Sequence, residues 1–290
     1  MTFNTYKDVN EFYHLTYDVL MRHESQNMII LGNLIMGYEG KDKYDWRDPA
    51  NWFMAAVTDA SGSDVKLTAL MTPPHKLVIY ATDNQIDDTA LSCLIDGLDG
   101  YDIPGIHAEK NLAERFVEIY AKRYNVEYEP EKNMRVYELN HVNPGIPETG
   151  KLRHATEADI YYLPYWQECF WAECFNKSIE ISSDIEKYLH TIPNTYVLED
   201  YNGTPVSVAR SHRKMSTVCA VGFVYTPPYI RGKGYATDCV AQLSKLLLEK
   251  GYKGVSLYTD LANPTSNSIY MKIGYNPIAD VADIKFQKLK

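Results

Sequence analysis

The chain has 290 residues, of which 45% are hydrophobic and 23% charged, with a formal net charge of −9 at pH 7. This length suits two domains of ordinary size, and no run approaches the roughly 20 apolar residues that a membrane-spanning helix needs. The acidic balance argues against nucleic acid as a partner, so we expect neither nucleic acid nor a membrane.

The cysteines and the N-terminus predict a cytoplasmic protein without a metal centre. Residues 1–8 show no basic region followed by an apolar stretch, so no signal peptide is expected. Five cysteines are an odd number for a disulfide framework, and none lies in a CxxC spacing. We therefore expect free thiols and no zinc site.

The first half of the chain predicts alternating helices and strands. Helical patterns cover 9–21, 25–35, 86–98 and 111–123, and strand patterns cover 52–60, 67–71, 77–81, 105–108 and 135–139. After the strand at 77–81, the segment from Thr82 to Asp88 holds three aspartates and no glycine. Carboxylates at a helix N-terminus occupy the field that a bound anion needs, so no phosphate site is expected here.

Residues 141–150 predict a linker, because they contain two prolines and two glycines among polar residues. Residues 1–140 hold 13 basic against 23 acidic residues, a balance of −10. That half is either a solvated acidic surface or one that draws a cationic amine toward the protein. The predicted domains are 1–140 and 151–290.

The second half repeats the element order of the first. Strands are predicted at 152–154, 195–199, 205–211, 217–225 and 254–258, with the last ones between 276 and 286. Helices are predicted from a capping-box start at Thr156 to about 175, and at 184–190, 235–250 and 267–273. Alternating strands and helices of this kind predict an α/β fold with a mixed sheet.

A glycine loop joins the strand that ends at Tyr225 to the helix that begins at Tyr235. After Pro227 and Pro228 it reads Arg-Gly-Lys-Gly-Tyr-Ala, residues 231–236. Glycines let backbone N–H groups converge, and the helix dipole adds positive potential at the same point. The loop therefore predicts a diphosphate site, and about 30 residues later a second motif runs from Asn263 to Tyr275.

These two segments together resemble the GNAT superfamily of acyl-CoA-dependent N-acetyltransferases. Arg231, Gly234 and Ala236 fill the three places of the family pattern Arg/Gln-x-x-Gly-x-Gly/Ala. The family's second pattern is matched by four residues: Asn263, Tyr270, Gly274 and Tyr275. The resemblance covers about residues 150–290. Because the first half has the same element order, we expect tandem GNAT-like folds, the first degenerate and without cofactor. The alternative is an unrelated α/β domain.

The resemblance implies a binding site for acetyl-CoA as co-substrate. Backbone N–H groups from Arg231 to Ala236 would line the diphosphate, and the strand backbone at Phe223–Tyr225 would meet the pantetheine arm and polarise the thioester. The predicted cofactor contacts are Phe223, Val224, Tyr225, Arg231, Gly232, Lys233, Gly234, Tyr235, Ala236, Asn263 and Ser266. The alternative for Asn263 is a plain helix cap without cofactor contact. Ser266 or Asn267 could instead be the cap of this helix.

Tyr270 matches the family tyrosine that gives a proton to the departing CoA thiolate, and we predict it as the general acid. The general base is not readable, because the predicted strands 217–225 and 254–258 contain no glutamate. Other elements offer Glu168, Glu173, His190, Glu199 and His212, and a water chain is an equal alternative. Some rings of the first helix could line the acceptor pocket: Tyr161, Tyr162, Tyr165, Trp166, Phe170 and Trp171.

The predicted function is an acetyl-CoA-dependent N-acetyltransferase that moves an acetyl group directly to a primary amine of a small molecule or peptide. One alternative is a binding module that holds CoA or acyl-CoA without turnover. Another is transfer of a longer acyl group. The sequence is compatible with an oligomer.

Overall fold

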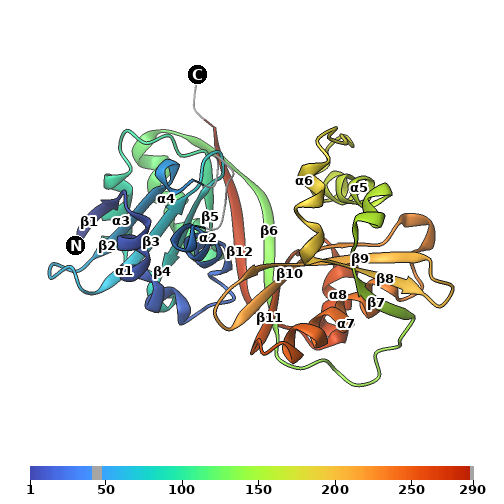
Figure 1. Ribbon diagram of the computed structural model, residues 1–290. Coiled ribbons are helices and arrows are strands. Elements are labelled where there is room, and N and C mark those ends of the chain that lie inside the picture. The colour runs from blue at the N-terminus through green and yellow to red at the C-terminus, as the bar shows by residue number, and fades with distance from the viewer. Residues whose placement is uncertain (41–47, 288–290) are drawn as a thin grey trace. The chain divides into compact units, whose positions relative to one another are not determined.

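The computed structural model describes residues 1–40 and 48–287, which form two units (Figure 1). Unit 1 comprises Met1–Val136, Thr259–Ala262 and the C-terminal strand from Pro277 on, and unit 2 comprises Tyr137–Tyr258 and Asn263–Asn276. Each unit is a mixed sheet with helices on both faces. The α/β fold with a mixed sheet is confirmed.

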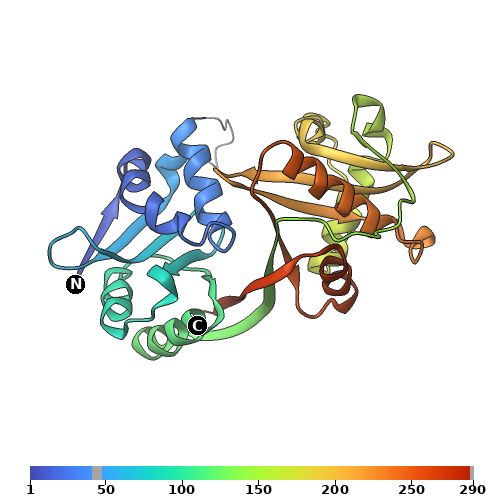
Figure 2. The ribbon, with the colours of Figure 1, turned by 90° about the horizontal axis from the view of Figure 1, so that it is seen from below.

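Unit 1 contains most of the predicted elements with small shifts at their ends, except that the strand predicted at 135–139 begins eight residues earlier, at Glu127. Its helices are α1 (Val9–Met21), α2 (Met28–Glu39), α3 (Asp88–Gly97) and α4 (Lys110–Tyr124). Its strands are β1 (Thr2–Tyr6), β2 (Phe53–Thr58), β3 (Val65–Met71), β4 (Leu77–Ala81), β5 (Gly105–Glu109), part of β6 (Glu127–Leu139) and nearly all of β12 (Asn276–Gln287). The view in Figure 2 shows α1 and α2 on one face of this sheet and α3 and α4 on the other.

Unit 2 follows the predicted order of strands and helices. Its strands are the end of β6, then β7 (Gly150–His154), β8 (Thr195–Asp200), β9 (Pro205–Lys214), β10 (Val218–Tyr225) and β11 (Gly254–Asp260) up to Tyr258. Its helices are α5 (Leu163–Phe175), α6 (Glu186–Leu189), α7 (Tyr235–Glu249) and α8 (Pro264–Ile273). Helices α5 and α6 lie on one face of the sheet, and α7 and α8 lie on the other (Figure 1).

The first helix of unit 2 is interrupted where one helix was predicted from Thr156 to about 175. The capping box of Thr156 and Asp159 forms, but it opens a 3₁₀ turn at Glu157–Tyr161, and α5 begins only at Leu163. Pro164 lies in the first turn of α5. Proline is tolerated there because the first-turn N–H groups have no helical partner, whereas inside a continuous helix it would break the ladder.

The two halves of the chain exchange their final strands. The strand order is β1-β2-β3-β4-β5-β12-β6 in unit 1 and β6-β11-β10-β9-β8-β7 in unit 2, so β6 contributes to both. Strand β12 pairs antiparallel with β5 of the first half, from Val281 opposite Glu109 to Lys285 opposite Gly105. The sequence predicted that this last segment completes the domain 151–290, and the structure places it in unit 1 instead.

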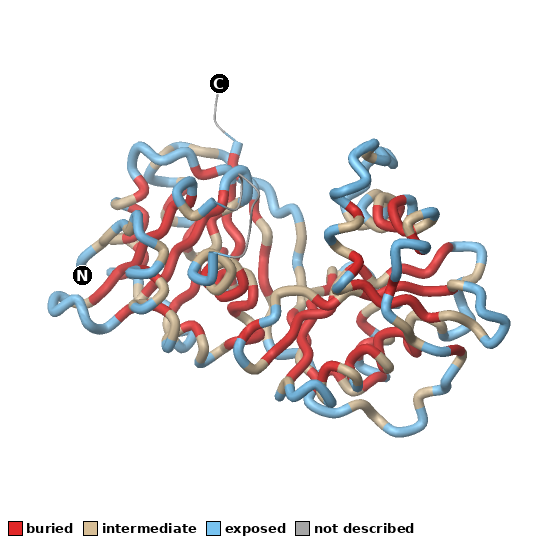
Figure 3. The backbone as a smooth tube through the Cα atoms, in the orientation of Figure 1, coloured by how far each residue is buried: buried red, intermediate tan, exposed pale blue. Residues whose placement is uncertain are grey.

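Separate hydrophobic cores hold the sheets to their helices. In unit 1, inward residues of β2–β5 pack with α3, α4 and β12, including Phe116, Leu91 and Ile284. In unit 2, Tyr137 and Leu139 of β6 join a core with α7 and α8. Figure 3 shows the strands of both sheets as the most buried part of the chain. Among the described residues, no helix is long and apolar enough to span a membrane.

Candidate active site

The glycine loop leaves a helix N-terminus without a side-chain cap. Gly232 and Gly234 have φ of 79° and 86°, in the left-handed region that glycine adopts without strain, and Gly234 is the N-cap of α7. Among residues 1–40 and 48–287, no side chain accepts a capping hydrogen bond at this end of α7. In the part of the chain that the structure describes, the backbone N–H groups of residues 232–237 have no recorded partner. Uncommitted amides at the positive end of a helix dipole are suited to bind a phosphate.

The strand before this loop bulges and parts from its neighbour. Opposite β9, Gly222 pairs with Arg210 and Tyr225 pairs with Val208, so Phe223 and Val224 face one residue, and Phe223 has a φ of 47°. On the other side, the register with β11 covers Val218–Ala220 and Gly254–Ser256 of the described strands. The backbone of residues 223–225 therefore has an edge that can accept a strand-like ligand.

Helix α8 carries Asn263 and Tyr270. Asn263 is the N-cap, and its Oδ1 accepts a hydrogen bond from the N–H of Ser266 at 3.0 Å, so the cap is neither Ser266 nor Asn267. Asn267 is buried and accepts a hydrogen bond from the hydroxyl of Tyr137 at 2.9 Å. Tyr270 is 7% exposed, and burial raises its pKa, which keeps the phenol protonated and able to donate.

The end of α5 brings the loop and Tyr270 to the same region of unit 2. Glu173 accepts hydrogen bonds from Nη2 of Arg231 at 2.8 and 2.9 Å. The adjacent Cys174 acts electrostatically on the hydroxyl of Tyr270. The Arg231 guanidinium also donates to the carbonyl of Thr226, and its own backbone N–H donates to Pro228. The predicted phosphate contact of Arg231 is therefore not preformed.

Comparison with known proteins shows where this arrangement occurs. Residues 160–275 match the model of the acetyltransferase (GNAT) family, a range that contains the glycine loop, the bulged strand and Tyr270. This segment is a GNAT domain. Among curated proteins, none is similar enough to the sequence to count as a match.

Several solved structures share the fold over nearly the whole chain. A Drosophila melanogaster protein has a TM-score of 0.68 at 12% identity, covering 98% of each chain. A GCN5-related N-acetyltransferase from Sphaerobacter thermophilus has 0.60 at 12%, covering 98% of this chain and 95% of the other. A tandem GNAT protein from the clavulanic acid biosynthesis pathway has 0.56 at 10%, covering 98% of each. These likenesses show a tandem GNAT fold.

The candidate bases of the GNAT domain are mostly committed to other partners. Glu173 pairs with Arg231, Glu168 accepts from the hydroxyl of Tyr188 at 3.2 Å, and Glu199 accepts from Arg153 at 2.7 Å. His190 is exposed. Burial, with Arg213 and Arg210 nearby, lowers the pKa of His212 to about 3, so its imidazole is a poor proton acceptor. Of the five, Glu168, Glu173 and Glu199 are therefore engaged and His212 is disfavoured as a base.

The aromatic residues of the first helix divide into core and surface. Trp166 is buried beside Tyr225, with Phe170 and Tyr162 partly buried around the same cluster. In contrast, Tyr161, Tyr165 and Trp171 are exposed. The phenol of Tyr162 donates to Asp159, the carboxylate that also holds Arg153. Of the partly buried rings, Phe170 lies against Phe223, with ring centroids 5.5 Å apart.

The sequence analysis missed Asp238, which ties the chain to the first turn of α7. Its Oδ2 accepts hydrogen bonds from the N–H and hydroxyl of Thr149 at 2.6 and 2.9 Å, and its Oδ1 accepts from Gln242 at 2.8 Å. Asp238 is 1% exposed. The sequence did not indicate this role, because an acidic residue in the first turn of a helix is common and does not reveal its distant partner.

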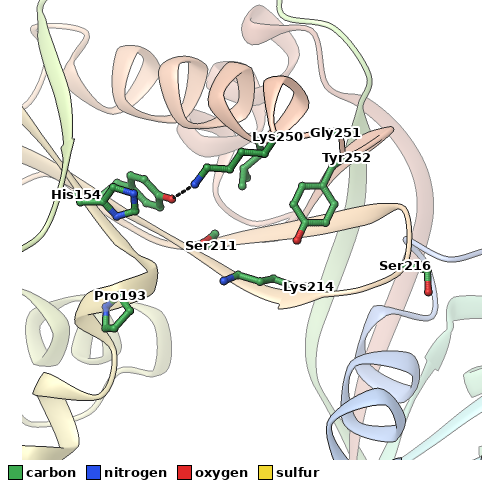
Figure 4. Close-up of a pocket in the computed structure, with 10 residues that line it drawn as sticks. His154, Pro193, Ser211, Lys214, Ser216, Lys250, Gly251 and Tyr252 are labelled. Atoms are coloured by element: carbon green, nitrogen blue, oxygen red, sulfur yellow. Dashed lines mark hydrogen bonds between the residues drawn. The ribbon is translucent and has the colours of Figure 1, made fainter. Parts of the chain in front are cut away.

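A cavity of about 370 Å³ lies at the opposite end of α7 from the glycine loop (Figure 4). Its lining includes His154, Lys214 and Lys250, and Figure 4 shows both ammonium groups on the side of His154. Lys250 donates to the hydroxyl of Tyr196 at 2.9 Å. A helix of 15 residues separates the two ends by about 22 Å, so this cavity is not part of the candidate site.

The corresponding helix of unit 1 begins differently. Strand β4 leads into a 3₁₀ turn and then α3, whose N-cap Asp87 accepts hydrogen bonds from the N–H groups of Thr89 and Ala90 at 2.8 and 3.3 Å. Asp83 pairs with Arg22, and Asp88 pairs with Arg115. The carboxylate of Asp87 thus occupies the position at this helix where an anion would bind.

Proposed function

We propose that this protein is an acetyl-CoA-dependent N-acetyltransferase that acetylates a primary amine by direct transfer within unit 2. The observation that carries the proposal is the uncapped N-terminus of α7, with uncommitted amides at 232–237, directly after a bulged strand. Diphosphate and pantetheine need these two features side by side. The match of residues 160–275 to the GNAT family supports the same assignment.

In this proposal the amides of 232–237 hold the diphosphate, with Gly232, Gly234 and Ala236 keeping side chains out of its way. Lys233 is exposed and adds a positive charge near the loop, and Tyr235 packs against the core of unit 2. The backbone of Phe223, Val224 and Tyr225 holds the pantetheine arm and polarises the thioester carbonyl. Asn263 and Ser266 contact the cofactor from the start of α8.

The amine lone pair attacks the thioester carbon, the carbon–sulfur bond breaks, and an amide forms. The proton of Tyr270 goes to the departing thiolate, the proton that the attacking nitrogen loses leaves to water, and water returns a proton to Tyr270. We further propose that unit 1 binds no acyl-CoA, and that the reaction takes place in the cytoplasm, where the five free cysteines stay reduced.

An assay of thiol release from acetyl-CoA against a panel of amines tests this function, with binding followed separately by calorimetry. We expect saturable acetyl-CoA binding and turnover with at least one class of primary amine. Binding of acetyl-CoA without turnover on any amine would instead identify a non-catalytic binding module. Turnover restricted to longer thioesters would make it an acyltransferase of another chain length.

A further inference from the structure

Arg210 of β9 is a cation held by neutral oxygens. Its Nε donates to Oγ1 of Thr195 at 2.9 Å, and its Nη2 donates to Oε1 of Gln167 at 2.8 Å and to Oγ1 of Thr191 at 2.9 Å. A guanidinium has five N–H donors: one on Nε and two on each terminal nitrogen. Three are used, so the two donors of Nη1 remain.

No carboxylate of the described residues pairs with Arg210. Among the described residues it forms no ion pair, and burial lowers its pKa to about 10 with no acidic neighbour to raise it. Arg153 of the same unit is neutralised in the usual way, because the carboxylates of Asp159 and Glu199 both pair with its guanidinium. A charge taken from water costs free energy unless a counter-charge meets it.

The two N–H groups of Nη1 that have no partner among the described residues are accessible to solvent. Nη1 of Arg210 is not among the fully buried polar atoms that lack a partner, and the residue is only partly covered. Nη1 therefore keeps contact with solvent, the side from which an anion would arrive. The other side of the guanidinium is fixed by three hydrogen bonds, which preorganise the free edge.

The position of Arg210 is next to the proposed reaction centre. It pairs in register with Gly222, the residue before the bulge, and its guanidinium lies 4.6 Å from the ring centroid of Phe223. His212 lies on the same face of β9, and its Nε2 is 2.6 Å from where a Cβ on Gly222 would stand. The cation is thus beside the backbone that would hold the thioester.

The hydrogen bonds to Thr195, Gln167 and Thr191 all end on neutral oxygens, so none of them offsets the positive charge of Arg210. A cation at this place also repels a simple amine, which arrives as an ammonium ion. The repulsion disappears when the acceptor carries its own anionic group, and a guanidinium matches a carboxylate in both charge and planar geometry.

We propose that Arg210 binds a carboxylate of the acceptor through Nη1, so that the substrate is an amine bearing a carboxylate, such as an amino acid. This inference rests on the proposed acetyltransferase function and names its substrate class. The carboxylate would be held by Arg210 while the amine reaches the thioester beside Phe223.

The test compares amino acids with their carboxamides, which keep the amine and lose the negative charge. The parent protein is expected to prefer the acid in kcat/KM by about 10–100-fold, the range of one charge-assisted hydrogen-bonded contact. Arg210→Gln should remove this preference by raising KM for the acid, while the rate with the carboxamide stays within about threefold. Arg210→Lys should retain part of the preference.

Lys214→Gln is the matched control, because Lys214 is an exposed cation on the same strand, bonded to Asn194 at 2.7 Å. Its acid-to-amide ratio should equal that of the parent. An equal loss with acid and amide in Arg210→Gln, or no preference in the parent, would overturn the proposal.

Binding separates this inference from the proposed function. Calorimetry with the CoA-loaded protein should detect the amino acid in the parent and not in Arg210→Gln, whether or not turnover occurs. If the parent acetylates neutral amines but binds no carboxylate, the inference fails and the function stands. If the parent binds the amino acid but acetylates nothing, the function fails and the carboxylate site stands.

Discussion

The helices α3 and α7 follow corresponding strands of the two units, yet their N-termini are opposites. At α3 the carboxylate of Asp87 accepts from two first-turn N–H groups, and at α7 a glycine with a φ of 86° stands at the same point without a side-chain cap. The same fold thus contains one helix end that its own carboxylate caps and one that lacks a side-chain cap, where we propose that an anion binds. The two helix ends thus differ in whether a carboxylate or a glycine stands at the N-cap.

The two halves of the chain also share strands, β6 and β12. Unit 2 contains Tyr137 and Leu139 from the end of β6, both fully buried, and unit 1 contains β12 from the end of the chain. Each half therefore depends on a strand that the other half supplies. We therefore expect that the two halves cannot fold separately.

The largest expected effect concerns that dependence. A fragment of residues 145–290 loses Tyr137 and Leu139, and each lost large buried side chain costs about 3–5 kcal/mol. Together these two losses are comparable with the whole free energy of unfolding of an ordinary domain, about 5–15 kcal/mol. We expect no cooperative unfolding transition by circular dichroism, whereas a fragment beginning at Glu127 retains β6 and should be better folded. Equal, cooperative unfolding of both fragments would show that the second half is independent.

The next effect assigns catalysis to unit 2. Tyr270→Phe keeps the ring and its packing but removes the proton donor, so kcat should fall by about 10²–10⁴-fold while acetyl-CoA affinity changes little. Because burial raises the pKa of Tyr270, the parent phenol stays protonated and the loss should be the same from about pH 6 to 9. Steady-state kinetics of acetyl transfer measure this. An unchanged kcat would make Tyr270 a core residue only.

A smaller effect is expected when only the charge at the N-terminus of α7 is changed. Asparagine and aspartate both tolerate a positive φ, so Gly234→Asn and Gly234→Asp impose similar strain. Aspartate adds a negative charge where the diphosphate binds, and we expect about 10–100-fold weaker acetyl-CoA binding than for asparagine, with the gap narrowing at high salt. Calorimetry on both variants provides the comparison. Equal affinities at low salt would contradict a diphosphate site at this loop.

The smallest effect tests the α3 terminus. Asp87→Ala removes a side chain that caps Thr89 and Ala90, so the free energy of unfolding should fall by about 1 kcal/mol. Denaturant titration measures this loss, with Asp64→Ala as an exposed control. A variant as stable as the parent would mean that Asp87 does not satisfy this helix end.

Local features were readable from the sequence where short-range chemistry determines them. The helix at Val9–Met21 and the strand at Leu77–Ala81 were predicted to the residue, and the glycine loop was placed at the start of α7. The strand exchange was not, because the pattern of 276–286 indicates a strand but not its partner. Strand β1 was missed since its five residues are partly exposed and lack a clear alternation.

The candidate site was also predictable only where short-range sequence patterns determine it. Arg210 gave no signal, because its sequence neighbourhood is an ordinary alternating strand, and only the tertiary structure shows that no acid in the described part of the chain pairs with it. Asn263 was recognised by its motif, but the choice of N-cap among Asn263, Ser266 and Asn267 needed the geometry. Long-range pairing and charge compensation are properties of the folded chain.

The number of acetyl-CoA molecules bound per chain tests the central contrast between α3 and α7 most directly. Titration calorimetry on the full-length protein should give one site per chain, and Gly234→Asp should weaken that site while Asp87→Ala leaves the stoichiometry at one. Two sites per chain, or one site whose affinity Gly234→Asp leaves unchanged, would contradict the assignment of acyl-CoA binding to unit 2 alone.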